Sequence, residues 1–517
     1  MNATLVIFGA SGDLTSRKLI PSLYRVMDQL GEGTRIVGFA RSAFSDDAWR
    51  EHLGEKSREF IPNFDLERWN RFARQIFYQA GSLESSEDMT ALAKRLDLLE
   101  AEVTTVPTAG VDASRGANVP AQSSNKRSRI YYLATAPSLY AVAAQRLSAA
   151  GLVDVSKGPR RVVIEKPFGT DLASAKQLNV QLHEVLDESQ IFRIDHYLGK
   201  ETVQNLLVFR FANEIFEPLW NREHIASVEI TAMESVAVGH RGAYYDRAGV
   251  WRDMIQNHLF QLLALTTMES PARLDADSIR DEKTKIFRSI EPLSENDILR
   301  NTVGGQYVGY HDEANVAPAS RTPTFAALRL KITNRRWGGV PFFIRSGKSS
   351  SCTTTQIVVR FRRPPISWFS NTCHGGSCDP NRLVIQIQPA EGIHLDFLAR
   401  QPDGGMNVRN ATLNFRFSGT TPSRLQENLQ AKVQLVEKMP EAYQRLLLDA
   451  ISGDASLFIR SDETEAAWTV LDPIIHAYET RADLPLEPYE PGSWGPESST
   501  QWIRSWGSEW YDLCPIL

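Results

Sequence analysis

The chain has 517 residues, and its 57 Lys and Arg nearly balance 62 Asp and Glu. This length favours at least two domains, and the balanced charge argues against nucleic-acid or membrane partners. The N-terminus lacks the basic start of a signal peptide, and no apolar run is long enough for a membrane helix. Four cysteines are too few for a disulfide framework. We expect a cytoplasmic protein in which Cys352 is an ordinary thiol.

The first elements predict a dinucleotide site. An apolar strand at residues 5–8 leads into a glycine-rich turn, and apolar residues at helical spacing follow from Ser16 to Leu30. Glycine lets such a turn be tight and lets a pyrophosphate approach the backbone. A second strand at 35–40 completes a βαβ unit. We expect the cofactor to lie on Gly9, Ala10, Ser11, Gly12, Asp13, Leu14 and Thr15.

The end of the second strand favours NADP over NAD. A free ribose 2′-OH would favour Asp or Glu there, whereas this chain has Arg41 and Ser42. The arginine offers a permanently charged fork for a 2′-phosphate, and the serine offers a hydroxyl donor. The alternative is that Arg41 is an ordinary surface residue.

The next segment brings a lysine to the same edge of the predicted sheet. Residues 101–126 lack periodicity and predict a loop or a partly disordered insertion. A strand at 129–133, a helix ending near Leu152 and a strand at 161–164 follow. Ligands of doubly wound sheets bind outside the carboxyl ends of the strands. Lys166 is therefore placed where cofactor and substrate could meet.

A polar cluster at residues 193–201 follows a strand at 191–194. If a helix begins near His196, this imidazole and Lys200 lie four residues apart on one face. The unpaired N–H groups and the dipole of a helix start would add to these two side chains. The pattern predicts a phosphate site, and the alternative is a solvated helix start whose charges pair with one another.

His258 is a candidate general base. It lies on the apolar stripe of a helix predicted over residues 251–265, where a histidine is more often a core residue. A buried carboxylate beside the imidazole would orient it and stabilise its protonated form. Asp253 precedes His258 by five residues, and Asp195 is available from another element.

The second half of the sequence predicts a domain with a different fold from the first. Beyond Gln306 the chain is rich in strands, and helices return at 439–452 and 462–478. Cys373 and Cys378 lack a second pair of ligands, so no metal site is expected. The fold class is an α/β Rossmann-like dinucleotide-binding domain over 1–190, followed by a larger α+β domain with a mainly antiparallel sheet over 191–517.

The assembled motifs resemble those of the glucose-6-phosphate dehydrogenase family nearly from end to end. This resemblance implies oxidation of glucose 6-phosphate at C1 to 6-phosphogluconolactone, with reduction of NADP, as the first step of the oxidative pentose phosphate pathway. It also implies a homodimer or homotetramer formed through the sheet of the larger domain. The motifs are GASGDLT at 9–15, GFARS at 38–42, EKPFG at 165–169, RIDHYLGKE at 193–201, RDMIQNH at 252–258, VPFFIRSGK at 340–348, PNRLVIQIQPAEGI at 380–393 and DAISGDASLFIRSDETEAAW at 449–468.

The resemblance also implies residue roles. His258 would take the proton of the C1 hydroxyl, and Asp195 would stabilise the imidazolium. The cofactor would lie on residues 9–15, Arg41, Tyr140 and Lys166. The residues implied to bind the substrate are His196, Tyr197 and Lys200 for the phosphate, Glu234 and Asp253 for sugar hydroxyls, and Lys166 and Lys348 as further donors.

Three departures from the family pattern leave alternatives open. A second basic residue expected after Lys348 is replaced by neutral Thr353, Ala136 stands where the family favours a proline, and the 101–126 insertion is additional. One alternative is a related hexose dehydrogenase with another substrate or with NAD. Another is a catalytically silent regulatory paralogue, against which the retention of His258 and Asp195 argues.

Overall fold

The computed structural model describes residues 2–104, 127–366, 368–369, 380–402, 405–417 and 441–514. Most of the predicted insertion, and also Cys373 and Cys378, lie outside these residues. Within them, no helix is long and apolar enough to cross a membrane. The chain forms two compact units: Met1–Gly169, Ala173–Gly199 and Glu441–Ser461 make the first, and Thr170–Leu172, Lys200–Pro440 and Asp462–Leu517 make the second.

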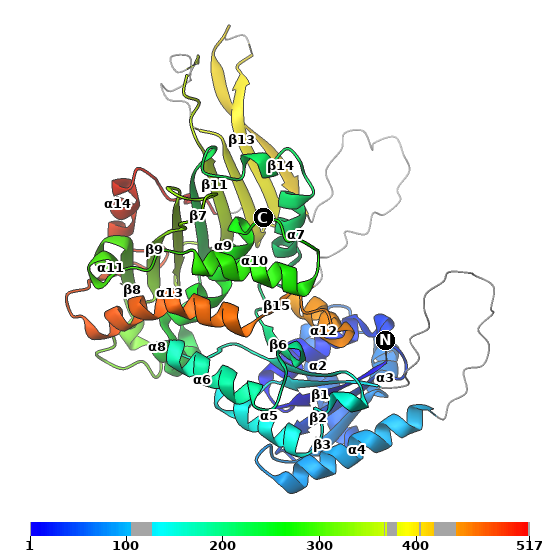
Figure 1. Cartoon of the computed structure of the whole chain (residues 1–517). Coiled ribbons are helices and arrows are strands. Elements are labelled where there is room, and N and C mark those ends of the chain that lie inside the picture. The colour runs from blue at the N-terminus through cyan, green and yellow to red at the C-terminus, as the bar shows by residue number, and fades with distance from the viewer. Residues whose placement is uncertain are drawn as a thin grey trace, which may run out of the picture. The chain divides into compact units, whose positions relative to one another are not determined.

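The first unit contains a seven-stranded sheet in the order β15-β6-β5-β4-β1-β2-β3 (Figure 1). All neighbours are parallel except β15, which returns from far along the chain to pair antiparallel with β6. The predicted domain boundary between residues 190 and 191 therefore separates β15 from the sheet to which it belongs. The strands are β1 (Ala3–Phe8), β2 (Arg35–Ala40), β3 (Ile76–Ala80), β4 (Ser128–Leu133), β5 (Arg160–Ile164), β6 (Ile191–Ile194) and β15 (Phe458–Ile459).

Helices and short helical turns connect the strands of the first unit. The helix predicted over residues 16–30 is three consecutive pieces. Pro21, which has no N–H, lies near the start of the middle piece, and the helical backbone ends at Val26 before the last piece. The elements are η1 (Thr15–Leu19), α1 (Ile20–Arg25), η2 (Met27–Gln29), α2 (Asp46–Phe60), α3 (Leu66–Ala73), α4 (Ser86–Thr104), η3 (Pro137–Leu139), α5 (Tyr140–Ala149), η4 (Val155–Lys157), α6 (Leu172–His183), η5 (Glu188–Gln190) and α12 (Ala442–Ser452).

The second unit contains a nine-stranded sheet in the order β14-β13-β12-β11-β7-β10-β9-β8-β16. Only β7 with β10 and β8 with β16 pair in parallel. The predicted fold class, Rossmann-like and then mainly antiparallel α+β, is confirmed. The strands are β7 (Ile225–Met233), β8 (Thr302–Tyr307), β9 (Phe325–Lys331), β10 (Pro341–Gly347), β11 (Thr354–Phe361), β12 (Arg382–Gln388), β13 (Gly392–Arg400), β14 (Val408–Arg416) and β16 (Leu486–Tyr489).

The helices of the second unit include the segment that carries His258. The helix predicted at 251–265 is a wide π-type turn, η8, continued by α9, and Gly249 at φ +59° separates η8 from α8. The elements are α7 (Glu201–Phe211), η6 (Glu217–Leu219), η7 (Gly239–Arg241), α8 (Gly242–Val250), η8 (Trp251–Leu259), α9 (Phe260–Thr267), α10 (Ala276–Arg288), α11 (Glu295–Asn301), η9 (Tyr310–Asp312), α13 (Ser461–Thr480) and α14 (Glu497–Ser505).

A disulfide joins Cys352 to Cys514, 162 residues later. The expectation that Cys352 is an ordinary thiol is therefore wrong. The C-terminal segment reaches it because the backbone of Tyr511 bonds to the side chains of Glu229 (3.1 Å) and Gln356 (2.8 Å) on the sheet. Such a pairing depends on the tertiary fold, and cysteine spacing carries no sign of it.

Candidate functional site

The glycine-rich turn after β1 has the geometry of a dinucleotide site. Gly9 adopts φ +76°, a conformation that favours glycine. Its N–H donates to the carbonyl oxygen of Phe39 (2.9 Å), and the N–H of Gly12 donates back to the carbonyl oxygen of Gly9 (2.9 Å). A Cβ on Gly9 would lie 2.2 Å from the carbonyl oxygen of Ala134. Both the conformation and the space therefore require glycine here.

A cavity of about 510 Å³ opens beside this turn, within the size range of small-molecule sites. Of the predicted cofactor residues, it is lined by Gly9, Ser11, Arg41 and Ser42. Residues at the end of β2 and after β3 and β4 also line it, because parallel strands end at the same edge. None of these residues was among the predicted cofactor residues. These further lining residues are Phe39, Ala40, Gly81, Ser82, Leu83, Glu84, Thr135, Ala136, Ser138 and Leu139.

Several predicted cofactor residues do not line this cavity. Tyr140 begins α5 with its side chain buried. Lys166 follows β5 and precedes a cis peptide bond to Pro167. The others outside the cavity lining are Ala10, Gly12, Asp13, Leu14 and Thr15, which belong to the turn and the helix start below it.

Arg41 has the charge and exposure expected of a 2′-phosphate ligand. Its side chain is exposed, and within the described part of the chain it forms no ion pair. The hydroxyl of Tyr78 donates to the carbonyl oxygens of Ser42 (2.7 Å) and Ala40 (3.2 Å), which fixes the backbone on both sides of Arg41. A cavity with an unneutralised guanidinium at its rim fits NADP.

Replacing Arg41 by alanine should raise KM for NADP without changing KM for NAD. A lost charge-assisted hydrogen bond costs about 1.5–3 kcal/mol, or about tenfold to hundredfold in affinity. Initial rates with each cofactor measure the effect. Arg74→Ala is the control, because Arg74 is also exposed but does not line the cavity. Equal KM changes for both cofactors would contradict the role given to Arg41.

Replacing Gly9 by alanine should destabilise the protein by about 3 kcal/mol and abolish NADP binding. The left-handed conformation costs about 1–2 kcal/mol, and overpacking against Ala134 adds about 1–3 kcal/mol. Gly339→Ala is the control, since Gly339 has φ +91° with nothing near its added Cβ. Denaturant unfolding and NADP titration check this. Equal losses of stability in the two variants would contradict the close-approach argument.

Glu165, beside Lys166, is held in a buried polar cluster. Burial raises the pKa of its carboxyl, against hydrogen bonds from Tyr132 and Tyr443 that lower it. The hydroxyl of Tyr132 contacts Glu165 Oε1, and the hydroxyl of Tyr443 donates to the same oxygen (3.1 Å). This cluster fixes the end of β5, from which Lys166 follows.

Asp195 organises the turn after β6, and the predicted helix start at His196 is wrong. The fully buried Asp195 accepts a hydrogen bond on Oδ1 from the N–H of Tyr197 (2.9 Å). The N–H of Leu198 donates to the carbonyl oxygen of Asp195 (3.0 Å). These bonds favour a turn, so α7 begins only at Glu201 and Lys200 is its N-cap. His196 and Lys200 therefore do not share a helical face.

Lys200 has a partner that the sequence analysis missed. Its ammonium contacts Oε1 of Gln388, the last residue of β12, which precedes a cis peptide bond to Pro389. Gln388 lies within a motif that carries the family resemblance, and its place at a strand end is the signal that could have singled it out. The amide oxygen of Gln388 thus helps to fix the position of the Lys200 ammonium at the start of α7.

Glu234 and Lys348 form a pair in the second unit. The ammonium of Lys348 contacts Oε2 of Glu234 and lies 5.1 Å from the centre of the buried Tyr245 ring. Neutral Thr353 also lies at this site, where its Oγ1 accepts a hydrogen bond from the N–H of Ser235 (3.0 Å). At the position where the family has a second basic residue, this chain therefore has a threonine whose hydroxyl oxygen holds the backbone of Ser235.

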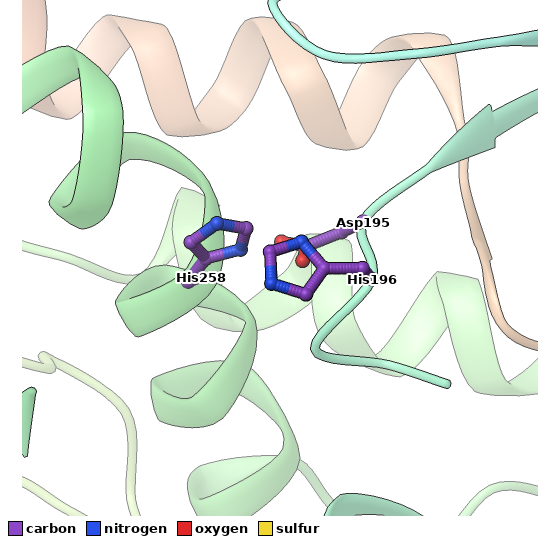
Figure 2. A group of neighbouring side chains, drawn as sticks. All are labelled: Asp195, His196 and His258. Atoms are coloured by element: carbon purple, nitrogen blue, oxygen red, sulfur yellow. The ribbon is translucent and has the colours of Figure 1, made fainter. Parts of the chain in front are cut away.

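His258 and Asp253 both lie on η8 and are almost fully buried. The N–H of His258 donates to Oδ1 of Asn257 (2.7 Å), and the hydroxyl of Tyr244 donates to Oδ1 of Asp253 (3.3 Å). Figure 2 shows the imidazole of His258 on this helical segment, and the side chains of Asp195 and His196 on the chain that follows β6. Buried polar side chains of this kind need polar partners, which makes each a candidate for chemistry.

Comparisons with known proteins identify the family. Residues 6–109 and 113–205 match the model for "Glucose-6-phosphate dehydrogenase, NAD binding domain", and residues 207–511 match the model for the C-terminal domain of the same enzyme. Glucose-6-phosphate 1-dehydrogenase from Aggregatibacter actinomycetemcomitans is 40% identical over 98% of this chain and 97% of its own length. The enzyme from Treponema pallidum is also 40% identical, over 98% of this chain and 94% of its own.

Solved structures of the same family are similar to this chain over its whole length. A glucose-6-phosphate dehydrogenase in complex with its substrate glucose 6-phosphate has a TM-score of 0.83 and 34% identity over 99% of both chains. Glucose-6-phosphate 1-dehydrogenase from Mycobacterium avium has a TM-score of 0.79 and 32% identity over both full chains. The family resemblance of the sequence motifs is confirmed, and the chain belongs to the glucose-6-phosphate dehydrogenase family.

Proposed function

We propose that this protein oxidises D-glucose 6-phosphate at C1 to 6-phospho-D-glucono-1,5-lactone and reduces NADP to NADPH. The observation that carries the proposal is the match to this family over almost the whole chain. The cavity with Arg41 at its rim supports NADP as the cofactor. A homodimer or homotetramer in the cytoplasm is part of the same proposal.

In the proposed reaction, His258 removes the proton of the C1 hydroxyl while hydride leaves C1. A bound NADP would supply the acceptor for this hydride, with residues 9–15 and Arg41 holding the nucleotide. The two electrons of the C1–H bond leave with the hydride, and the O–H electrons form the lactone carbonyl. Asp195 stabilises the imidazolium that results. The burial of both side chains supports these roles, because charges interact more strongly away from water.

The substrate contacts in this proposal are those that the family resemblance implies. His196, Tyr197 and Lys200 bind the phosphate, and the family resemblance of the segment at residues 193–201 supports this role. Glu234 and Asp253 accept hydrogen bonds from sugar hydroxyls. Lys166 and Lys348 donate to the substrate, with Lys348 oriented by its ion pair to Glu234.

Specificity constants test the proposed substrate and cofactor. We expect glucose 6-phosphate to exceed glucose by at least about a hundredfold in kcat/KM, because charge-assisted contacts of about 1.5–3 kcal/mol each are lost without the phosphate. NADP should likewise exceed NAD. Thr353 favours the alternative of a related hexose substrate, and faster turnover of another hexose or of NAD would establish it. A folded sample without turnover would establish a silent paralogue.

A further inference from the structure

A second cavity, of about 530 Å³, lies within the second unit. None of the residues proposed above to bind glucose 6-phosphate or NADP lines it. Its walls come from α8, η8, α13 and the segment that leads into β9. The lining residues are Thr170, Asp246, Arg247, Ala248, Gly249, Trp251, Arg252, Arg321, Thr322, Pro323, Ile475, Tyr478 and Glu479.

The charges around this cavity favour an anion. Arg252 forms an ion pair with Glu479 (2.7 Å). Arg247 and Arg321 donate only to backbone carbonyl oxygens, those of Ala243 (3.0 Å) and Leu484 (2.9 Å), and form no ion pair within the described ranges. Two guanidinium groups therefore keep their positive charge unneutralised at the cavity.

The remaining carboxylate, Asp246, is already satisfied. Burial would raise its pKa, but hydrogen bonds from Ser320, Ala317 and Tyr310 more than offset this and hold the pKa of the Asp246 carboxyl below its usual value. The N–H of Ala317 and the hydroxyl of Tyr310 donate to it at 3.2 and 2.9 Å. The carboxylate oxygens of Asp246 are thus already engaged by hydrogen-bond donors of the protein.

The lining of the cavity also includes aromatic side chains. The rings of Trp251 and Tyr478, both buried, pack with their centres 5.5 Å apart, and Pro323 and Ile475 extend the apolar lining. These side chains give the cavity an apolar surface on which the body of a bound molecule can pack.

The cavity also adjoins the break that precedes the His258 segment. Gly249, at the break, lines the cavity, with Arg247 before it and Arg252 after it. The N–H of Val250 donates to the carbonyl oxygen of Pro323 (3.1 Å). A molecule held by Arg247 on α8 and by Arg321 before β9 would link these two segments and so fix the angle at which η8 begins. The η8 segment carries Asp253 and His258.

We propose that this cavity binds a small organic anion with an aromatic or apolar body, and that its occupancy changes the rate of the step at His258. Paired guanidinium groups recognise phosphate or carboxylate oxygens, and the Trp251 and Tyr478 wall receives the body. The binding part is independent of the proposed function, whereas the rate part rests on it.

Calorimetric titration with 1-naphthyl phosphate tests the binding. The full chain is first saturated with glucose 6-phosphate and NADPH, which occupy both proposed sites without turnover. We expect one molecule bound per chain with Kd below about 1 mM, and at least about tenfold weaker binding in Arg321→Met and in Arg247→Met. Arg363→Met, an exposed arginine outside the cavity, should bind as the unmodified protein does.

Two comparisons define the ligand class and the effect on rate. 1-Naphthol and inorganic phosphate should each bind at least about tenfold more weakly than 1-naphthyl phosphate. At saturating substrates, 1-naphthyl phosphate should change kcat, and Arg321→Met should remove this change.

Absence of saturable binding up to about 10 mM, or equal binding by Arg321→Met and Arg363→Met, would overturn the site. Equal binding of 1-naphthol would overturn the anionic class, and equal binding of inorganic phosphate would overturn the aromatic or apolar body. Binding that leaves kcat unchanged would overturn the link to His258. A chain that binds the probe but shows no dehydrogenase activity would count against the proposed function and not against the site.

Discussion

His258→Ala is expected to lower kcat by about 10²–10⁴-fold. The imidazole is the group proposed to take the proton of the C1 hydroxyl, so the loss should fall on kcat, with KM for glucose 6-phosphate little changed. Initial rates of NADPH formation measure both constants. Asp195→Asn should also lower kcat, because a neutral amide does not stabilise an imidazolium.

The control for this prediction is His224→Ala, which removes an exposed histidine from the same unit. It should leave both constants unchanged. If His258→Ala keeps more than about a tenth of the unmodified kcat, His258 is a core histidine, as its apolar stripe alone would suggest, and another group is the base.

Lys283→Ala is expected to destabilise the protein by about 3–5 kcal/mol. Its ammonium lies 2.9 Å from Oε1 of Glu463, and both side chains are almost completely buried. The same oxygen accepts a hydrogen bond from the Gln261 amide (2.7 Å). Removing the lysine leaves a buried carboxylate without its counter-charge, and urea unfolding should show a lower midpoint at an unchanged slope.

The double variant Lys283→Met with Glu463→Leu separates burial of charge from loss of packing. It should recover most of the stability, because two apolar side chains replace the pair and no charge is stranded. The solvent-accessible pair of Arg481 and Asp483 is the control, and Arg481→Ala should lower the stability much less than Lys283→Ala does. A double variant as unstable as Lys283→Ala would contradict this explanation.

Local backbone chemistry made the cofactor site predictable. The requirement for glycine at Gly9 and the basic residue Arg41 after β2 are set within a single βαβ unit, and the structure places both at one cavity. The sequence motifs sufficed to identify the family, since they are long and span the chain. The two-part fold could be predicted from the spacing of apolar residues, because this spacing is set within each helix and each strand.

The remaining features depend on contacts between distant segments. The turn at Asp195 replaced the helix predicted at His196, because a buried carboxylate bonded to the local backbone. The Cys352–Cys514 disulfide and the contact of Lys200 with Gln388 join residues 162 and 188 positions apart. Propensity and spacing report on neighbours along the chain, so these contacts had no local signal.

Glucose 6-phosphate deuterated at C1 shows whether hydride passes from this carbon to NADP. The protein is incubated with this substrate and NADP, and the nucleotide product is analysed by mass spectrometry. We expect NADPH that carries one deuterium per molecule, formed in equal amount with the lactone or its hydrolysis product. Unlabelled NADPH, or oxidation at another carbon, would contradict it.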